Sequence, residues 1–294
     1  MALRADAMSR PSVLPGTRGF VIAELLVALV IAAIIGVALT QLVVSQSRFA
    51  ALQGGIIQAR GGARAALNVM ATDFRMVSDS GLVAAAHDSV TVRVPYTFGV
   101  ACAQTAGTTV VSLLPTDSAT YNSDTLPSGY AWRDTTGKFV FKEGATVANP
   151  NAPLSWCTGA TPPIATLAAT GWAARAVAVS PNDIRTPSGA VVYLYHLVRY
   201  AFAPSGQLPG RIGLWRTVLS TGRRDELVAP FDTSTSFQFL VGTRLTPRVN
   251  PPAVLDSVLG LRLVLVAASE QAPEGRSKPE TFTITSNVVF QNHP

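Results

Sequence analysis

The stretch RGFVIAELLVALVIAAIIG, Arg18 to Gly36, is the most informative part of the sequence. From Phe20 to Leu39 the chain is almost wholly apolar, and Glu24 is its one charge. At about 1.5 Å per residue, a helix of this length crosses the roughly 30 Å hydrocarbon layer of a bilayer. The stretch therefore predicts a helix that spans a membrane.

The flanking charges predict the orientation of this helix. Arg4, Arg10 and Arg18 precede it, and the next charge after Glu24 is Arg48. Because positive residues stay on the cytoplasmic side, we expect the amino terminus in the cytoplasm and the chain beyond about residue 45 outside.

Glu24 is the unusual residue of the segment. A carboxylate inside a bilayer costs a few kcal/mol, so it marks a functional site for which a partner is expected. The alternative is that Glu24, which lies near the cytoplasmic end, reaches the headgroups and has no further role.

The same string resembles the prepilin cleavage and methylation motif of type IV pilins and type II secretion pseudopilins. In that family a membrane peptidase cuts after the glycine that matches Gly19, and the new first residue, here Phe20, is N-methylated. Glu24 matches the glutamate at the fifth mature position, which meets the amino group of a neighbouring subunit. Residues 21–23 depart from the usual threonine, leucine and isoleucine but remain apolar.

The resemblance implies a leader peptide over 1–19 and a single-pass precursor in the inner membrane, with a periplasmic or extracellular globular domain. Its implied partners are the prepilin peptidase and methyltransferase, other pilin or pseudopilin subunits, and the inner-membrane assembly platform. The main alternative is an ordinary secretory signal peptide, cut among the small residues 32–38, which would release a soluble protein. Glu24 and the length of the apolar run count against it.

A helical period continues beyond the membrane segment. Apolar residues recur at steps of three and four: Ile56, Ala59, Ala63, Ala66, Met70 and Phe74. We therefore expect one helix over 20–77, with 20–40 in the membrane or filament core. The pairs Gly54-Gly55 and Gly61-Gly62 predict points where the helix bends or locally melts, and close packing against the globular domain is the alternative.

After Ser80 the period changes to two, which is typical of strands. Val90, Val92 and Val94 alternate with polar residues, and Pro95 is expected to end this run. Further strands are predicted at 108–114, 138–142, 175–179, 190–202, 211–219, 235–241, 258–267 and 280–290. The pattern predicts an α+β fold, in which the long N-terminal helix packs on a mainly antiparallel sheet in a globular domain over 78–294. The stretch 95–172 is expected to be a loop-rich insertion.

Cys102 and Cys157 both lie in that insertion. No cysteine or histidine is close to either at the spacing of metal ligands. A disulfide in an extracytoplasmic domain is the favoured interpretation, and two unpaired thiols are the alternative.

Catalytic chemistry is not indicated. The chain has no nucleophile elbow, phosphate loop, dinucleotide fingerprint or metalloprotease helix, so we expect no enzyme, no cofactor and no metal. His196 is expected to be a packed histidine, and the acceptors Asn122, Ser123 and Asp124 to be a turn rather than a calcium site. Aromatic residues of the predicted strands are expected in the core, namely Tyr193, Tyr195, Tyr200, Phe202 and Trp215.

The net charge of +6 comes from scattered basic residues, and the rings do not alternate with them in the sequence, so no nucleic-acid partner is predicted. Five alternating runs occupy the carboxy-terminal half, at 191–202, 213–219, 231–242, 255–269 and 280–292. Their order loosely resembles that of the PilW-like and GspJ-like minor pilins and pseudopilins, although Gln291-Asn292 replaces the usual Arg-Asn ending. This implies a low-abundance structural subunit, in a complex that primes filament assembly. The sequence leaves open a type IV pilus, a type II secretion system or a DNA-uptake system. The alternative function is a pilin-anchored adhesin or binding protein that displays 95–172.

Overall fold

The computed structural model describes residues 22–105, 107–123, 126–157, 175–270, 272 and 276–290. Gly19 and Phe20 lie outside the described residues. The chain divides into two compact units, residues 1–51 and 52–294.

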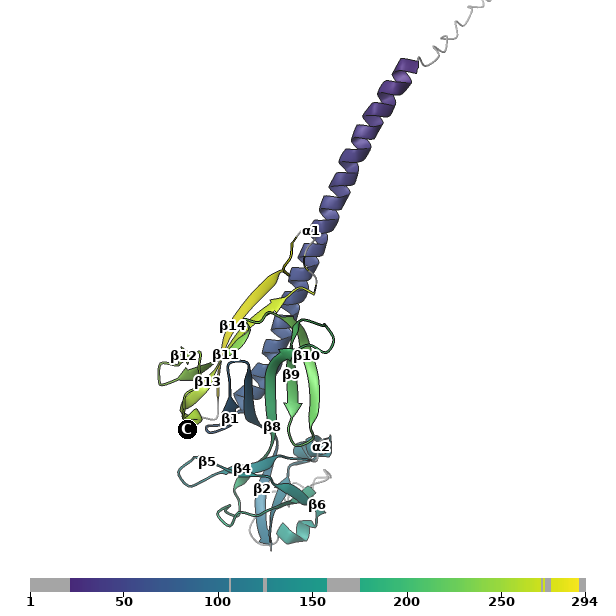
Figure 1. The fold of residues 1–294 in the computed structure, drawn as a ribbon. Helices are drawn as coiled ribbons and strands as arrows, with labels where there is room; N and C mark the ends of the chain where they lie inside the picture. The colour runs from purple at the N-terminus through teal and green to yellow at the C-terminus, as the bar shows by residue number, and fades with distance from the viewer. Residues whose placement is uncertain are drawn as a thin grey trace, which may run out of the picture. The chain divides into compact units, whose positions relative to one another are not determined.

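Helix α1 runs without interruption over Ile22–Met76, 55 residues (Figure 1). Within the second unit, its buried residues follow a single stripe, Ala59, Ala63, Ala66, Met70 and Phe74. The stripe predicted from the sequence is thus confirmed. Ile56, at the start of the predicted stripe, is partly buried.

Fourteen strands form one sheet, and every described ladder is antiparallel. The strands are β1 (Leu82–Ala85), β2 (Ser89–Thr105), β3 (Thr108–Leu113), β4 (Gly129–Arg133), β5 (Phe139–Glu143), β6 (Thr146–Ala152), β7 (Arg175–Ser180), β8 (Val191–Pro204), β9 (Ile212–Val218), β10 (Arg223–Phe231), β11 (Ser236–Val241), β12 (Thr246–Arg248), β13 (Val258–Ala268) and β14 (Thr281–Val289). The main path is β12-β11-β13-β10-β9-β8-β2-β3-β7-β6. Three short helices complete the described chain: α2 (Pro115–Ser123), η1 (Leu154–Cys157) and η2 (Leu255–Ser257). The fold is α+β, with one long helix and a large antiparallel sheet.

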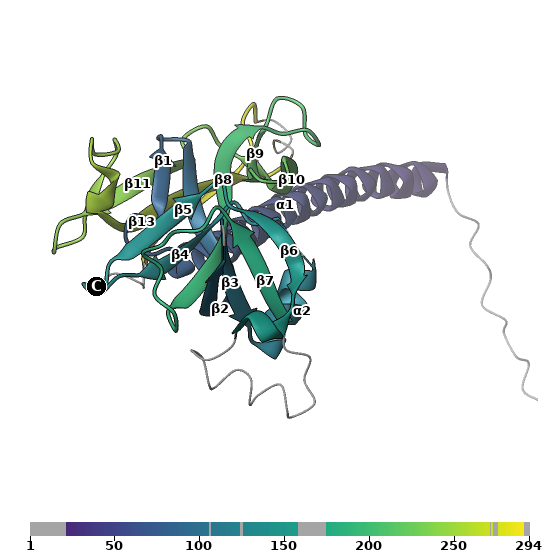
Figure 2. The ribbon, with the colours of Figure 1, turned by 90° about the horizontal axis from the view of Figure 1, so that it is seen from below.

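The sheet carries two large apolar cores, and β8 contributes to both. Val198 and Tyr200 of β8 join the stripe of α1 in the first core. Val192 and Leu194 of the same strand pack in the second core, with Trp132 of β4 and residues of β3 and β7. All four residues lie at even positions, so one face of β8 lines both cores. Figure 2 shows β3, β7 and β6 beside β2, on the side of the sheet domain that holds the second core.

Pro95 does not end its strand, contrary to the prediction. β2 continues to Thr105, and its register against β8 shifts between Pro95 and Thr97. A proline lacks the N–H that a regular ladder uses, and at a bulge that donor is not needed. The predicted insertion 95–172 accordingly holds most of β2, the strands β3 to β6 and helix α2, while residues 158–174 lie outside the described part of the chain.

The glycine pairs do not melt the helix. A Cβ on Gly55 would lie 3.0 Å from Ser269 Cβ, and one on Gly62 would lie 3.2 Å from Val228 Cγ1, whereas Gly54 and Gly61 have nothing within 4 Å. The prediction that the helix melts locally at these glycines is therefore wrong. Close packing, the alternative interpretation, applies to one glycine of each pair.

Candidate functional site

The candidate site is residues 22–47 of α1, called here the apolar segment. Every residue of this segment is exposed, and Glu24 is its one charged side chain. An 18-residue window of the helix reaches a mean hydropathy of 2.8, and none of that window is buried. A helix that is apolar on all sides is stable only when a membrane or other apolar surfaces surround it. The helix is long and apolar enough to cross a membrane.

Glu24 lies near the start of the described part of α1. Gly19 and Phe20 precede the described part of α1. The three residues of the predicted processing motif are therefore not brought together by the described geometry, and their roles stay predictions.

The second unit holds its part of α1 through close apolar packing. Ala63 and Ala66 are fully buried, and their small side chains let the strands approach the helix closely. The Phe74 ring lies 5.3 Å from the Tyr200 ring and 6.4 Å from the Phe237 ring, both edge to face. Such aromatic contacts add to the free energy of burial.

A polar cluster fixes the rotation of this helix against the sheet. Asp73 Oδ2 accepts a hydrogen bond from the Tyr200 hydroxyl at 2.5 Å and lies 3.4 Å from Arg216 Nη2. Arg216 Nε also donates to the Tyr200 oxygen at 3.2 Å. Burial raises the pKa of Tyr200, and the nearby Asp73 carboxylate raises that pKa further. The helix, β8 and β9 are thereby joined by groups that need one particular alignment.

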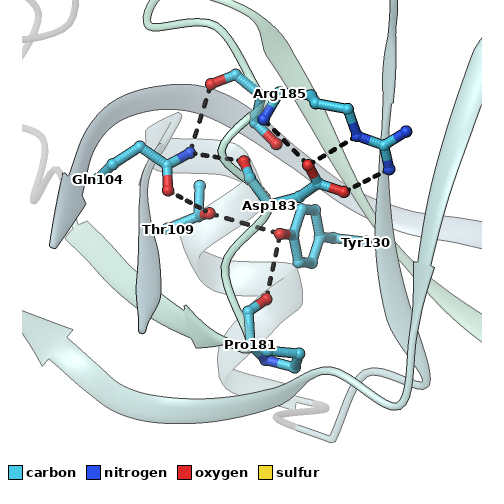
Figure 3. A network of polar contacts seen from close by, with 7 residues as sticks. Gln104, Thr109, Tyr130, Pro181, Asp183 and Arg185 are labelled. Carbon is cyan, nitrogen blue, oxygen red and sulfur yellow. Dashed lines mark hydrogen bonds and ion pairs between the residues drawn. The ribbon is translucent and has the colours of Figure 1, made fainter. Parts of the chain in front are cut away.

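A second polar network fastens the loop between β7 and β8 (Figure 3). The buried Asp183 carboxylate accepts hydrogen bonds from the Arg185 backbone and guanidinium, which hold the pKa of Asp183 below its usual value. Gln104 Nε2 donates to the Asp183 carbonyl at 3.1 Å, and the Tyr130 hydroxyl donates to the Pro181 carbonyl at 3.2 Å. Because these groups satisfy one another's hydrogen bonds, the network holds the loop in place against β2 and β4.

Cys102 of β2 and Cys157 of η1 form a disulfide, with a Cα–Cα distance of 4.8 Å. Closing a loop with a sequence separation of 55 stabilises the fold by about 4 kcal/mol on the chain-entropy model. Within the described ranges, no group of three or more His, Cys, Asp or Glu side chains is placed to hold a metal.

His196 is buried and stacks on Tyr96 with ring centroids 4.0 Å apart, as expected for a packed histidine. Tyr195 and Tyr200 are also buried, and burial raises the pKa of Tyr195 to about 12. Tyr193, one of the rings expected in the core, is only partly buried.

The remaining sequence candidates are placed as follows. Phe202 is buried, as expected for a core ring, whereas Trp215 is partly exposed. Asn122 and Ser123 end helix α2, so they do not form the expected turn. Asp124 lies outside the described residues.

No family model, curated protein or solved structure matches the chain. What the chain does therefore has to be argued from its own sequence and geometry.

Proposed function

We propose that this protein is a minor pilin or pseudopilin, a structural subunit of a type IV pilus or a type II secretion pseudopilus. The observation that carries the proposal is the apolar segment, a fully exposed helix with one carboxylate at its start. A soluble domain gains nothing from such a surface, since it costs solubility and buries nothing within the chain.

One helix would serve two states of the subunit. As a precursor, the apolar segment anchors the protein in the inner membrane, with the amino terminus in the cytoplasm and the sheet domain outside. After cleavage between Gly19 and Phe20 by the prepilin peptidase and methylation of Phe20, the same segment packs among the helices of neighbouring subunits. An apolar surface suits both surroundings.

Glu24 would supply the specificity of assembly. In a filament core the carboxylate has little water, so it requires a positive partner. The methylated amino group of Phe20 in a neighbouring subunit is such a partner, and it exists only after cleavage. Pairing would therefore admit processed subunits and reject precursors.

The narrower proposal is a PilW-like or GspJ-like subunit, and it rests on the loose resemblance of the carboxy-terminal sequence runs. The runs that carry this loose resemblance fall on β8, β9, β11, β13 and β14. Under this proposal the protein acts in the complex that primes filament assembly, with other subunits and the inner-membrane assembly platform as partners. A displayed adhesin is the competing function.

Incorporation into filaments tests the proposal. We expect Glu24→Ala to reduce the protein in the sheared filament fraction at least about tenfold, because a charge pair in apolar surroundings contributes a few kcal/mol. Gln41→Ala, which removes an exposed polar side chain from the same helix, should incorporate like wild type. Equal incorporation of both variants would refute the role of Glu24, provided that immunoblots show equal amounts in the membrane.

A further inference from the structure

The face of the sheet that points away from the two apolar cores carries a group of aromatic rings. Odd-numbered residues of β8 lie on this face, because the even-numbered ones line the cores. Tyr193 of β8 is paired with Phe98 of β2 on one side and with Ala131 of β4 on the other. Ala131 in turn is paired with Phe141 of β5. Cross-strand partners share a face, so the rings from β2, β8 and β5 lie together.

The rings form a continuous row. The centroid of Tyr193 lies 6.3 Å from that of Phe98 and 5.6 Å from that of Phe139, and Phe139 lies 6.1 Å from Phe141. Phe98 is 42% exposed and the other three are partly exposed. None of the four belongs to an apolar core. Adjacent aromatic side chains that remain open to solvent indicate a binding surface.

Arginines accompany this row. The Arg133 guanidinium carbon lies 4.7 Å from the centroid of Phe139, and that of Arg93 lies 4.3 Å from the centroid of Phe141. Arg199, at an odd position of β8, is exposed on the same face. Glu143, on the same side of β5, is bound by Arg93, and the buried Asp117 carboxylate accepts a hydrogen bond from the Phe98 N–H at 3.2 Å. Three arginines against these two carboxylates leave the face with a small excess of positive charge. We call these residues the arginine–aromatic face: Arg93, Phe98, Arg133, Phe139, Phe141, Tyr193 and Arg199.

We propose that the arginine–aromatic face binds single-stranded nucleic acid, with bases stacked on Phe98 and Tyr193 and phosphates held by Arg199 and by Arg133, which lies over the Phe139 ring. Aromatic platforms beside positive charge are how proteins bind single strands without sequence preference. Single strands expose unstacked bases that can lie on aromatic side chains, whereas the bases of a duplex stay stacked on one another, so the rings favour a single strand. A neutral sugar chain would draw no benefit from the positive charge.

This inference reverses the expectation from the sequence that no nucleic acid is bound. That expectation depended on rings and basic residues being separated along the chain. The pairing of β2, β4, β5 and β8 brings them together in space. The inference also stands apart from filament assembly, because it concerns the second unit alone.

Fluorescence anisotropy with a labelled oligodeoxythymidylate tests the proposal on the full-length protein in detergent micelles. We expect saturable binding that weakens as salt rises. Phe98→Ala should weaken binding about 5-fold or more, as loss of one stacked base does. Phe139→Ala should also weaken binding, because it removes the ring on which Arg133 lies. Trp156→Ala, which removes a ring that is 41% exposed but outside the face, should leave the affinity unchanged.

The charged residues give a second readout. Arg133→Gln should reduce the slope of log affinity against log salt by about 0.7, the value for one phosphate contact on a single strand. Arg248→Gln, an exposed arginine of β12, is the matched control and should leave this slope unchanged.

Three results would overturn the proposal. They are no binding at low salt, equal binding of inorganic polyphosphate with no effect of the ring variants, or preferential binding of a neutral oligosaccharide. Thermal unfolding of each variant separates lost binding from lost folding. If Phe139→Ala unfolds, the more exposed Phe98 still decides the outcome.

Discussion

The two parts of helix α1 differ in the burial and polarity of their side chains, although they form one continuous helix. Residues 22–51 are exposed throughout, and the part up to Leu39 is apolar on all sides apart from Glu24. Residues 52–76 bury one narrow stripe and present charged side chains elsewhere, Arg60, Arg64 and Arg75 among them. The second part is stabilised by its own chain. The first part presents an apolar surface that no described residue of the chain covers, and the helix there is long and apolar enough to cross a membrane.

The largest effect should come from the packed part. Phe74→Ala removes a fully buried ring between Tyr200 and Phe237, so we expect it to lower the free energy of unfolding by about 3–5 kcal/mol. Leu29→Ala, in the apolar segment, should stay within about 0.5 kcal/mol of wild type. Denaturant unfolding in detergent, followed by tryptophan fluorescence, measures both. Equal losses would remove the contrast between the two parts of the helix.

A substitution in the polar cluster of Asp73, Tyr200 and Arg216 should lower the free energy of unfolding by a smaller amount. Asp73→Asn removes the charge that faces Arg216 and weakens the hydrogen bond from Tyr200, at an expected cost of about 1.5–3 kcal/mol. Asp256→Asn, at an exposed carboxylate, is the matched control. If both substitutions leave the unfolding midpoint unchanged, the cluster does not fix the helix on the sheet.

Substitution of the neighbouring residues Gly61 and Gly62 should change the free energy of unfolding differently. Gly61→Ala adds a methyl group where nothing lies within 4 Å, so we expect it to raise the free energy of unfolding by about 0.5–1 kcal/mol. Gly62→Ala places its methyl group 3.2 Å from Val228, so the gain in helix propensity should be cancelled or reversed. Thermal unfolding of the two variants under identical conditions compares them directly. An equal gain from both would show that Gly62 is not held close to β10.

The helix and most strands were predictable because their apolar residues repeat at the right period. The stripe from Ala59 to Phe74 and the alternating residues of β13 are examples. β10 was missed because its first half, Arg223 to Glu226, is charged and hides the alternation. The continuation of β2 past Pro95 was missed because a bulge depends on the partner strand, which a local pattern does not contain.

The functional residues also fall into those that a local sequence pattern predicts and those that only the fold brings together. The processing motif is local, so the sequence predicts Gly19, Phe20 and Glu24 together. Asp73 and Tyr200 are 127 residues apart, and no local pattern links them. The rings and arginines of the outer sheet face come from separate strands, so only the pairing of these strands reveals them.

Mass spectrometry of the mature amino terminus, in a strain that contains prepilin peptidase, tests whether the protein is processed as a pilin. We expect a chain that begins with N-methylated Phe20, and an uncleaved precursor for Gly19→Ala. An amino terminus at or beyond residue 32 would identify an ordinary signal peptide and contradict the assignment to pilins.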